Sequence, residues 1–420
     1  MEETKDLEKL EKNIKIYKRY KMFAYDFIFY YSIFVIYFTT VKNFTMSQIM
    51  YFNGFYTLFV FLWQIFANLI TERIGLKKSI ILGNILVSLQ SLVYIFANDF
   101  IIFVFAECMG ALGFTLKSLS EGTLLYASLK HTGERKEFTK TEGKANSRYY
   151  YYDAITAFLS GTLFMVNNYL PIILCFVNTL ISLIISLRFS NVSEKITKKY
   201  KIRDTINDFK LVIKKQRVKA IILFACVFAG IVSVSTTLYK SIILEMGVSI
   251  ELNSIIICIC TIFVGIGAKQ LFMIESKTKN RTLTFFSFIY ITTLLSIGLI
   301  SNACELNLPV TIVIIFLLII IGFIQGAYRV AIKKYVLNFT TSKVRTKITS
   351  VYYMAENIGS TVMLFIIGIV LNYTTSAVAC ILFSAVSAVI LFIVLFYMKD
   401  KLGLKPQDYS PDEINNVNIS

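Results

Sequence analysis

The chain has 420 residues, of which 56% are hydrophobic and only 16% are charged, and its formal charge is +17. A soluble domain carries about 25% charged residues, so this composition excludes an ordinary soluble protein. The basic residues lie mostly in short segments between apolar runs, a pattern that indicates membrane topology and argues against nucleic-acid binding. The cysteines lie mostly in apolar runs and the single histidine, His131, lies between two of them, so we expect no metal and no cofactor.

Apolar runs long enough to cross a membrane follow one another along the chain. A span needs about 20 mostly apolar residues. We therefore predict an all-α membrane protein with twelve transmembrane helices, at 22–40, 47–70, 79–97, 100–126, 147–166, 170–189, 219–238, 250–273, 283–301, 308–332, 348–371 and 375–397.

The distribution of lysine and arginine predicts the orientation of these spans. The segments after the odd-numbered spans contain only Lys42 and Lys240, whereas the two tails and the segments after spans two, four and six contain clusters of bases. Basic loops stay in the cytosol, so we expect both termini in the cytosol and an even number of spans, ten if one pair is drawn too many. We expect the cell membrane as the location.

The longest connection divides the spans into six and six. The predicted parts are a cytosolic tail at 1–21, a six-helix bundle at 22–190, a cytosolic linker at 191–218, a second six-helix bundle at 219–398 and a cytosolic tail at 399–420. Within the linker, 204–215 has helical amphipathic spacing, which fits a helix on the membrane surface; an unstructured basic linker is the alternative.

The most specific local pattern follows the second span. Glu72 and Arg73 come before Gly75, which permits a tight turn, and Lys77 and Lys78 come after it. This order resembles the loop signature between helices two and three of the major facilitator superfamily. It departs from that signature at Asn68, at Glu72, where aspartate is usual, and at Leu76.

A second stretch, from Ser118 to Arg148, is similar to the region of helices four and five in bacterial members of that superfamily. The resemblance implies two six-helix bundles related by a pseudo-two-fold axis along the membrane normal. Two marks of proton-coupled drug exporters are missing, the proline–glycine pattern in helix five and the arginine midway in helix four.

Ionisable residues inside apolar spans are costly, so they usually face a partner or a wet cavity. Glu107 is the deepest of them and has no base one turn away, which makes it the best candidate for a proton carrier. A protonated packing residue is the alternative. Further candidates for transport or proton coupling are Asp26, Glu356 and Asp153.

Other charges fit structural or conformational roles. Lys117 and Glu121 are four residues apart and can pair along one helix face, and we predict that they form a charge network with Arg148 and Arg329. As a conformational latch, Glu72 would meet the start of span eleven near Arg345, with Arg73, Gly75, Lys77 and Lys78 completing the loop. Tyr30, Tyr56 and Trp63 are cavity-lining candidates, with lipid contact or packing as the alternative.

These features together predict a secondary active transporter and not an enzyme. The chain has no phosphate-binding loop for ATP hydrolysis, so we expect alternating access driven by a coupling proton or cation. The expected partners are a small-molecule substrate and the lipid bilayer, and the expected state is a monomer. Export of an amphipathic compound is preferred, with nutrient uptake and a non-transporting sensor or scaffold as alternatives.

Overall fold

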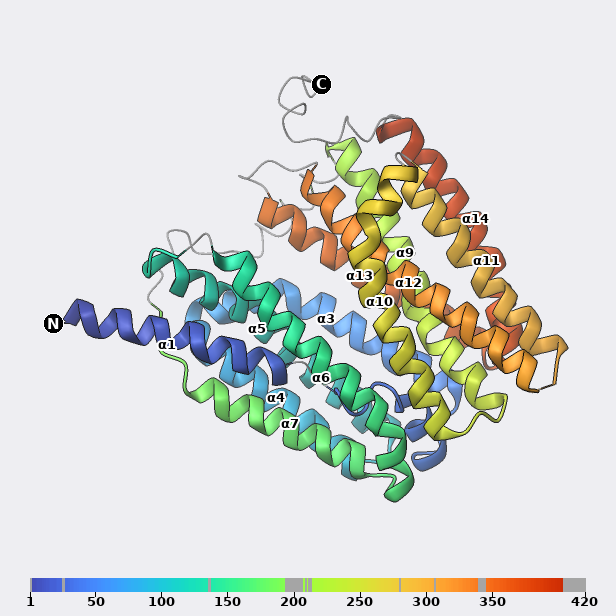
Figure 1. The fold of residues 1–420 in the computed structure, drawn as a ribbon, viewed down its shortest axis with the longest axis horizontal. Coiled ribbons are helices and arrows are strands. Elements are labelled where there is room, and N and C mark those ends of the chain that lie inside the picture. Colours follow the sequence, from blue (N-terminus) through green and yellow to red (C-terminus); the bar gives the residue numbers. More distant parts are fainter. Residues whose placement is uncertain are drawn as a thin grey trace. The chain divides into compact units, whose positions relative to one another are not determined.

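The computed structural model describes residues 2–24, 27–134, 137–192, 207, 210, 214–278, 281–305, 307–338 and 345–402. Among these residues the regular secondary structure is entirely helical, with no strand (Figure 1). The elements are α1 (Glu2–Phe23), α2 (Phe34–Ile36), η1 (Tyr37–Val41, a π-helix), α3 (Met46–Ile74), α4 (Leu76–Phe96), α5 (Phe100–His131), α6 (Phe138–Val166), α7 (Leu170–Leu187), α9 (Gln216–Glu245), α10 (Ile250–Thr278), α11 (Thr282–Ala303), α12 (Leu308–Asn338), α13 (Arg345–Val370) and α14 (Ser376–Leu402).

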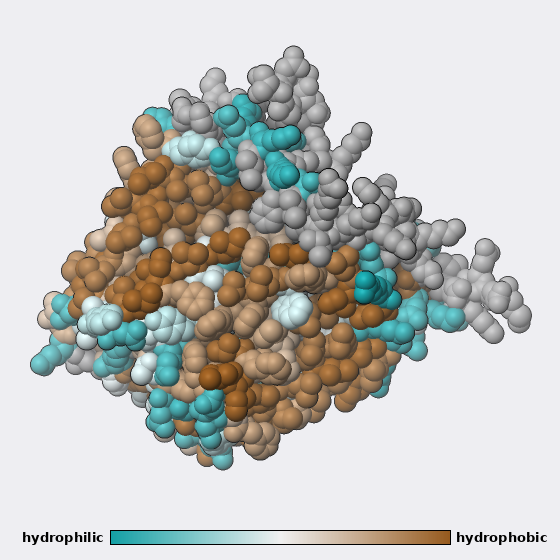
Figure 2. Space-filling model, turned by 180° about the vertical axis from the view of Figure 1, so that it is seen from behind, coloured by the Kyte–Doolittle hydropathy of each residue, from teal (hydrophilic) through white to brown (hydrophobic). Residues whose placement is uncertain are grey.

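Ten of the described helices are long and apolar enough to cross a membrane: α3, α4, α5, α7 and α9 to α14. This confirms the predicted all-helical membrane class and approximates the predicted count of twelve. Large apolar side chains such as Phe96, Phe272 and Phe392 are exposed, as expected for helices that face lipid. On the face drawn in Figure 2, hydrophobic side chains cover broad areas, and hydrophilic ones gather toward the margins.

The first predicted span, 22–40, is not a continuous helix. Helix α1 ends at Phe23, turns occupy Ile28 to Ile33, and α2 and η1 follow. Phe27 has φ 64°, a left-handed conformation that is uncommon for a bulky residue. The sequence 22–40 contains no proline or glycine, so no helix-breaking residue in this segment predicts the interruption.

The chain forms two compact units, which are described separately. Unit 1 comprises 1–37 and 58–202, and unit 2 comprises 38–57 and 203–420. The six-plus-six division with its linker stays a prediction, and most of the linker, including nearly all of 204–215, lies outside the described residues.

Unit 1 is built around α4, which packs on both α5 and α7, while α1 lies against α5, α6 and α7. Glycines let α4 and α5 approach closely. A Cβ on Gly83 would lie 2.7 Å from the carbonyl oxygen of Gly113, and the reverse distance is also 2.7 Å. Small residues of this kind are the usual means by which membrane helices pack.

Unit 2 pairs α9 with α13 and α14, α10 with α12, and α11 with α14. Gly322 and Gly326 lie four residues apart on α12 and face the backbone of α10 at Cys260 and Val264. This small-xxx-small spacing brings the two helix backbones together. In both units, therefore, backbone contact fixes the register in which polar side chains of neighbouring helices meet.

Candidate functional site

Glu107 lies two turns into α5 and is only 3% exposed. Its carboxylate accepts hydrogen bonds from the Tyr94 hydroxyl and from Gln90 Nε2, the latter at 3.2 Å. The Gln90 amide also donates to the Tyr94 hydroxyl at 3.1 Å. The three side chains form a closed ring, called here the Glu107 cluster, in which α4 supplies both donors.

The shape of α5 makes room for this cluster. Gly110 lies one turn after Glu107, and a Cβ at that position would overlap the Gln90 side-chain amide. The absence of a side chain at Gly110 is therefore what lets Gln90 reach the carboxylate.

An aromatic group closes around Tyr94. The Phe27 ring stacks on it at a centroid distance of 5.2 Å, and Tyr30 and Phe103 each lie 5.5 Å away. The Tyr37 hydroxyl donates to the backbone carbonyl of Tyr94 at 2.8 Å. Tyr30, predicted to line a cavity, is buried in this aromatic group.

The contacts described for the Glu107 carboxylate are with neutral groups. None of the ion pairs found among the described residues includes it. A buried carboxylate without a counter-charge is costly in its ionised form, and neutral hydrogen-bond donors offset only part of that cost. Chemically, the group can hold and release a proton.

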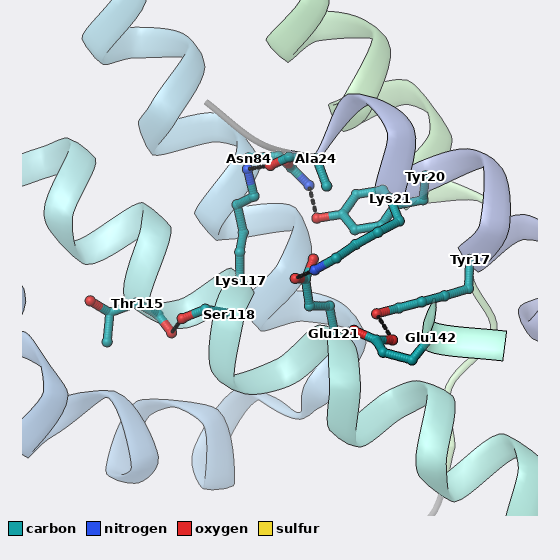
Figure 3. Close-up of polar contacts among 10 residues, drawn as sticks. All are labelled: Tyr17, Tyr20, Lys21, Ala24, Asn84, Thr115, Lys117, Ser118, Glu121 and Glu142. Atoms are coloured by element: carbon teal, nitrogen blue, oxygen red, sulfur yellow. Dashed lines mark hydrogen bonds and ion pairs between the residues drawn. The ribbon is translucent and has the colours of Figure 1, made fainter. Parts of the chain in front are cut away.

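A second buried cluster joins α1 and the adjoining Ala24 to α5 and α6 (Figure 3). Lys21 forms an ion pair with Glu121, and Lys117 Nζ donates to the carbonyl oxygen of Ala24 at 2.6 Å. The Tyr17 hydroxyl donates to Glu142 at 2.5 Å. The sequence suggested that Glu121 could pair with Lys117 on its own helix, whereas the structure pairs it with Lys21 of α1.

Further side chains fasten α1 along its length. Asn13 exchanges two hydrogen bonds with the backbone of Ser190, at 3.1 and 2.7 Å. Asn84 donates to the Tyr20 hydroxyl at 3.3 Å. Residues 13–21, expected to form part of a polar tail, thus contain several buried members of unit 1.

Unit 2 contains its own polar groups. Glu356 on α13 accepts a 2.7 Å hydrogen bond from the Tyr352 hydroxyl, and the charge of Arg329 acts on it. Gln325 on α12 donates to the Tyr290 hydroxyl at 3.0 Å, and Tyr290 shares a hydrogen bond with Ser235. The last three residues are called the Gln325 cluster.

The loop that follows α3 has the predicted turn. Gly75 has φ 85° and separates α3 from α4, and its carbonyl accepts from the Ser79 hydroxyl at 3.0 Å. Glu72 and Lys77 are half-buried, and Arg73 and Lys78 are exposed. Arg345 is the first residue of α13, but its side chain lies outside the described part, so the latch stays a prediction.

The remaining predicted residues have different surroundings. Asp26 lies outside the described residues, Asp153 is half-buried in α6, and Arg148 and Arg329 are exposed. Trp63 Nε1 donates to the carbonyl of Cys108 at 3.0 Å, beside Glu107, and Tyr56 is half-buried in α3. The structure therefore brings Glu107, Tyr30 and Trp63 into one region of unit 1.

Several polar residues of these clusters were not among the sequence-based candidates. Gln90 and Tyr94 lie four residues apart in an apolar helix, and Gln325 likewise interrupts an apolar run; polar residues in membrane spans are the signal that could have found them. Lys21 was counted among the bases of the tail, yet it is 4% exposed. Lys240, expected outside the spans, is a buried residue of α9.

Neither a protein-family model nor a curated protein sequence matches the chain. Solved structures do match along nearly all of it. A variant of the nucleoside transporter NupG superposes with a TM-score of 0.77 at 10% identity, covering 93% of this chain and 100% of that chain. A POT family transporter in complex with a thioalcohol-conjugated peptide gives 0.68 at 12% identity, with 95% and 96% covered.

A bacterial homologue of the human lysosomal transporter Spinster gives a TM-score of 0.65 at 13% identity, with 94% and 98% covered. At this level of identity the likeness establishes the fold. The chain is a multi-pass membrane protein with the fold of the major facilitator superfamily, which confirms the resemblance seen in the sequence.

Proposed function

We propose that this protein is a secondary active transporter that moves a small solute across a membrane by alternating access. The observation that carries the proposal is the agreement in fold, along nearly the whole chain, with three transporters of different solutes. Transporters are not enzymes, so the same observation favours transport over a membrane-bound catalyst. A sensor or scaffold remains the alternative that the experiment below must exclude.

The proposed coupling ion is the proton, and Glu107 is its proposed carrier. The support is geometric: a carboxylate buried two turns inside α5, held by two neutral donors and paired with no base among the described residues. Asp26, Asp153 and Glu356 remain further candidates. Of these, Glu356 accepts a hydrogen bond from the Tyr352 hydroxyl of its own helix.

For direction, we propose export of an amphipathic compound across the cell membrane by a monomer with both termini in the cytosol. The aromatic group around Tyr94 supports an apolar solute. A scarcity of buried bases gives this preference no support, because Lys21, Lys117 and Lys240 are all buried. Lys21 is neutralised by Glu121, and the amphipathic preference now depends on the aromatic residues alone.

Uptake of a polar nutrient is the second candidate, and one region of unit 2 favours it. Ser233 and Ser360 share a hydrogen bond at 2.8 Å, Thr57 and Thr361 share one at 2.9 Å, and Asn53 donates to Thr237 at 3.3 Å. Asn53, Thr57 and Ser233 are only half-buried. Half-exposed polar groups on apolar helices are suited to a water-filled cavity. A transporter that binds a neutral, hydroxyl-rich solute would use such groups.

The deciding experiment is a substrate-dependent pH change in proteoliposomes that contain the purified protein. The panel holds nucleosides, short peptides and lipophilic amines, with protein-free liposomes as the control. Acidification or alkalinisation of the lumen that saturates with one compound supports proton-coupled transport and gives its direction. Tight binding of a compound with no flux in either direction would favour the sensor.

The loop from Glu72 to Lys78 is proposed as the conformational latch. In the same vesicles, Glu72→Gln should slow net flux while leaving solute binding intact. Unchanged flux at equal protein content would remove Glu72 from the mechanism.

A further inference from the structure

Helix α6 is packed into unit 1 along one side. It lies mainly against α1, with fewer contacts to α5 and α7. Its buried residues share one face of the helix at helical spacing, and they are Thr141, Ala145, Thr156, Ser160 and Phe164. The opposite side of α6 is therefore an exposed surface of the protein.

That exposed side contains a row of residues, called here the α6 stripe, in which each member follows the last by three or four positions. Such spacing keeps side chains on one helix face. In chain order the members are Lys140, Lys144, Arg148, Tyr151, Ile155, Leu159, Thr162 and Val166, and all of them are exposed. The stripe thus begins with bases, continues with a tyrosine and ends with mostly aliphatic side chains.

This order matches the layers of a bilayer in depth. From Arg148 to Val166 the helix rises about 27 Å at 1.5 Å per residue, close to the hydrocarbon thickness of about 30 Å. Helix α6 ends at Val166, and two exposed asparagines follow. With Val166 at one boundary of the hydrocarbon, Arg148 lies at the other. Lys144 is then about 6 Å further out, among the headgroups, and Tyr151 is at the depth that tyrosine prefers.

The bases at headgroup depth have no acidic partner on the stripe. Lys140 pairs with Glu137 at 2.9 Å. None of the ion pairs within the described part of the chain includes Lys144 or Arg148. These two bases therefore leave the headgroup end of the stripe with a positive charge.

The two acids of α6 lie away from the stripe. Glu142 accepts a hydrogen bond from the Tyr17 hydroxyl at 2.5 Å and so lies toward α1. Asp153 is half-buried, and five residues separate it from Arg148, which places it on a different side of the helix. Neither carboxylate is therefore placed to neutralise the two bases.

We propose that the α6 stripe binds an anionic phospholipid. Lys144 and Arg148 are four residues apart, so their Cβ atoms lie about 6 Å from each other and both side chains can reach one phosphate. A guanidinium group binds phosphate through two parallel hydrogen bonds. Tyr151 would lie beside the glycerol region, and an acyl chain would run along Ile155 and Leu159.

The charge of the headgroup decides which lipid is preferred. Phosphatidylcholine carries the same phosphate, but its ammonium group would lie beside two bases that have no acid near them on the stripe. Phosphatidylglycerol carries the phosphate without a positive group. The proposal concerns this surface alone and does not depend on the transported solute.

The test is native mass spectrometry of the purified full-length protein in detergent, titrated with dioleoylphosphatidylglycerol or dioleoylphosphatidylcholine. The wild-type protein should bind the anionic lipid more tightly. Lys144→Gln/Arg148→Gln should weaken that binding about 30-fold and leave phosphatidylcholine binding unchanged, because each base beside an anionic lipid contributes about a factor of five. Both side chains are exposed, so the thermal midpoint without added lipid should equal that of the wild type.

Lys277→Gln/Arg281→Gln is the matched control. It removes two exposed bases that are also four residues apart, at the α10–α11 connection of unit 2, and it should leave the affinity for phosphatidylglycerol unchanged. Equal weakening by both double variants would overturn the proposal, because it would show general attraction to positive charge. Equal affinity of the wild type for the two lipids would also overturn it, as would displacement of the lipid by soluble glycerophosphoglycerol at an equal concentration. If the double variant is not recovered folded, Lys144→Gln and Arg148→Gln are measured singly, and an unchanged affinity in both would contradict the assignment.

Discussion

The Glu107 cluster of unit 1 and the Gln325 cluster of unit 2 share a motif but differ in charge. In each, a glutamine amide donates to a tyrosine hydroxyl, at 3.1 Å from Gln90 to Tyr94 and at 3.0 Å from Gln325 to Tyr290. The third member is a carboxylate in unit 1 and the Ser235 hydroxyl in unit 2. The same amide–phenol pair thus supports a group that can gain a proton and one that cannot.

This difference in charge distinguishes two roles that a buried polar cluster can have, which are to hold helices together and to carry a charge. Interhelical hydrogen bonds between neutral groups in membranes contribute about 0.6–2 kcal/mol, and Ser235 supplies such a bond at no electrostatic cost. A buried acid costs more than a serine. Stability alone therefore explains the Gln325 cluster, whereas Glu107 requires a further reason, and the reason that we propose is proton coupling.

The largest expected effect comes from exchanging the charge. Glu107→Gln should reduce proton-driven accumulation of solute more than 100-fold, because the amide cannot bind and release a proton, while exchange of solute for solute continues. The paired variant Gln325→Leu should change uphill flux by less than about 3-fold. Both are measured as flux in proteoliposomes with and without a pH gradient, and proton-driven accumulation by Glu107→Gln at the wild-type level would contradict the assignment.

The next effect concerns the glycines beside the two clusters. A Cβ at Gly326 would overlap the backbone carbonyl of Val264, which cannot move aside, whereas a Cβ at Gly110 would meet the flexible end of Gln90. Overpacking costs about 1–3 kcal/mol, so Gly326→Ala should lower the thermal midpoint clearly. Gly110→Ala should lower it less but impair proton-driven flux, because Gln90 is displaced from Glu107. Equal losses of stability would show that Gln90 is as rigid as a backbone.

Removing the two phenol groups should have a smaller effect. Hydrogen bonds to charged groups contribute about 1.5–3 kcal/mol and those between neutral groups about 0.5–1.5 kcal/mol. Tyr94→Phe should therefore slow proton-driven flux by about 10-fold, because a loss of about 1.4 kcal/mol corresponds to a factor of ten. Tyr290→Phe should lower only the thermal midpoint. A flux defect in Tyr290→Phe as large as that in Tyr94→Phe would break the distinction between the clusters.

The smallest effect is expected from the amides. Gln90→Leu removes one of two donors to Glu107, so flux should fall by about 2- to 5-fold with Tyr94 still in place. Gln325→Leu is the control with matched chemistry. Flux and thermal midpoint should be measured on the same preparations, and the double variant Gln90→Leu/Tyr94→Phe should be more impaired than either single variant.

Much of the fold was readable from the sequence, because length and apolarity alone identify a membrane span. Glu107 could be identified as a candidate site residue from the same pattern, because an acidic residue deep in an apolar run stands out in the sequence. Its partners Gln90 and Tyr94 were not, because their meeting depends on the register set by Gly83 and Gly113 across α4 and α5. A single sequence carries no information about which faces of two helices meet.

The interruption of the first span was beyond sequence reasoning for a different reason. Breaks in helices are normally marked by proline or glycine, and 22–40 contains neither. The donors that make the break tolerable, Lys117 and Asn178, come from α5 and α7. Lys21 was misread because a lysine beside other lysines looks like a topology signal, and only its distant partner Glu121 shows otherwise.

The way α1 is fastened has a consequence for biosynthesis. Helix α1 is synthesised before its partners, because those of Lys21 and Asn13 come 100 and 177 residues later in the chain. At about 5–20 residues per second, roughly 5–35 s pass between the synthesis of α1 and that of its partners. During this interval the polar groups on the inner face of α1 lack these partners, so a helix that is made early reaches its final place only after much of unit 1 has been made.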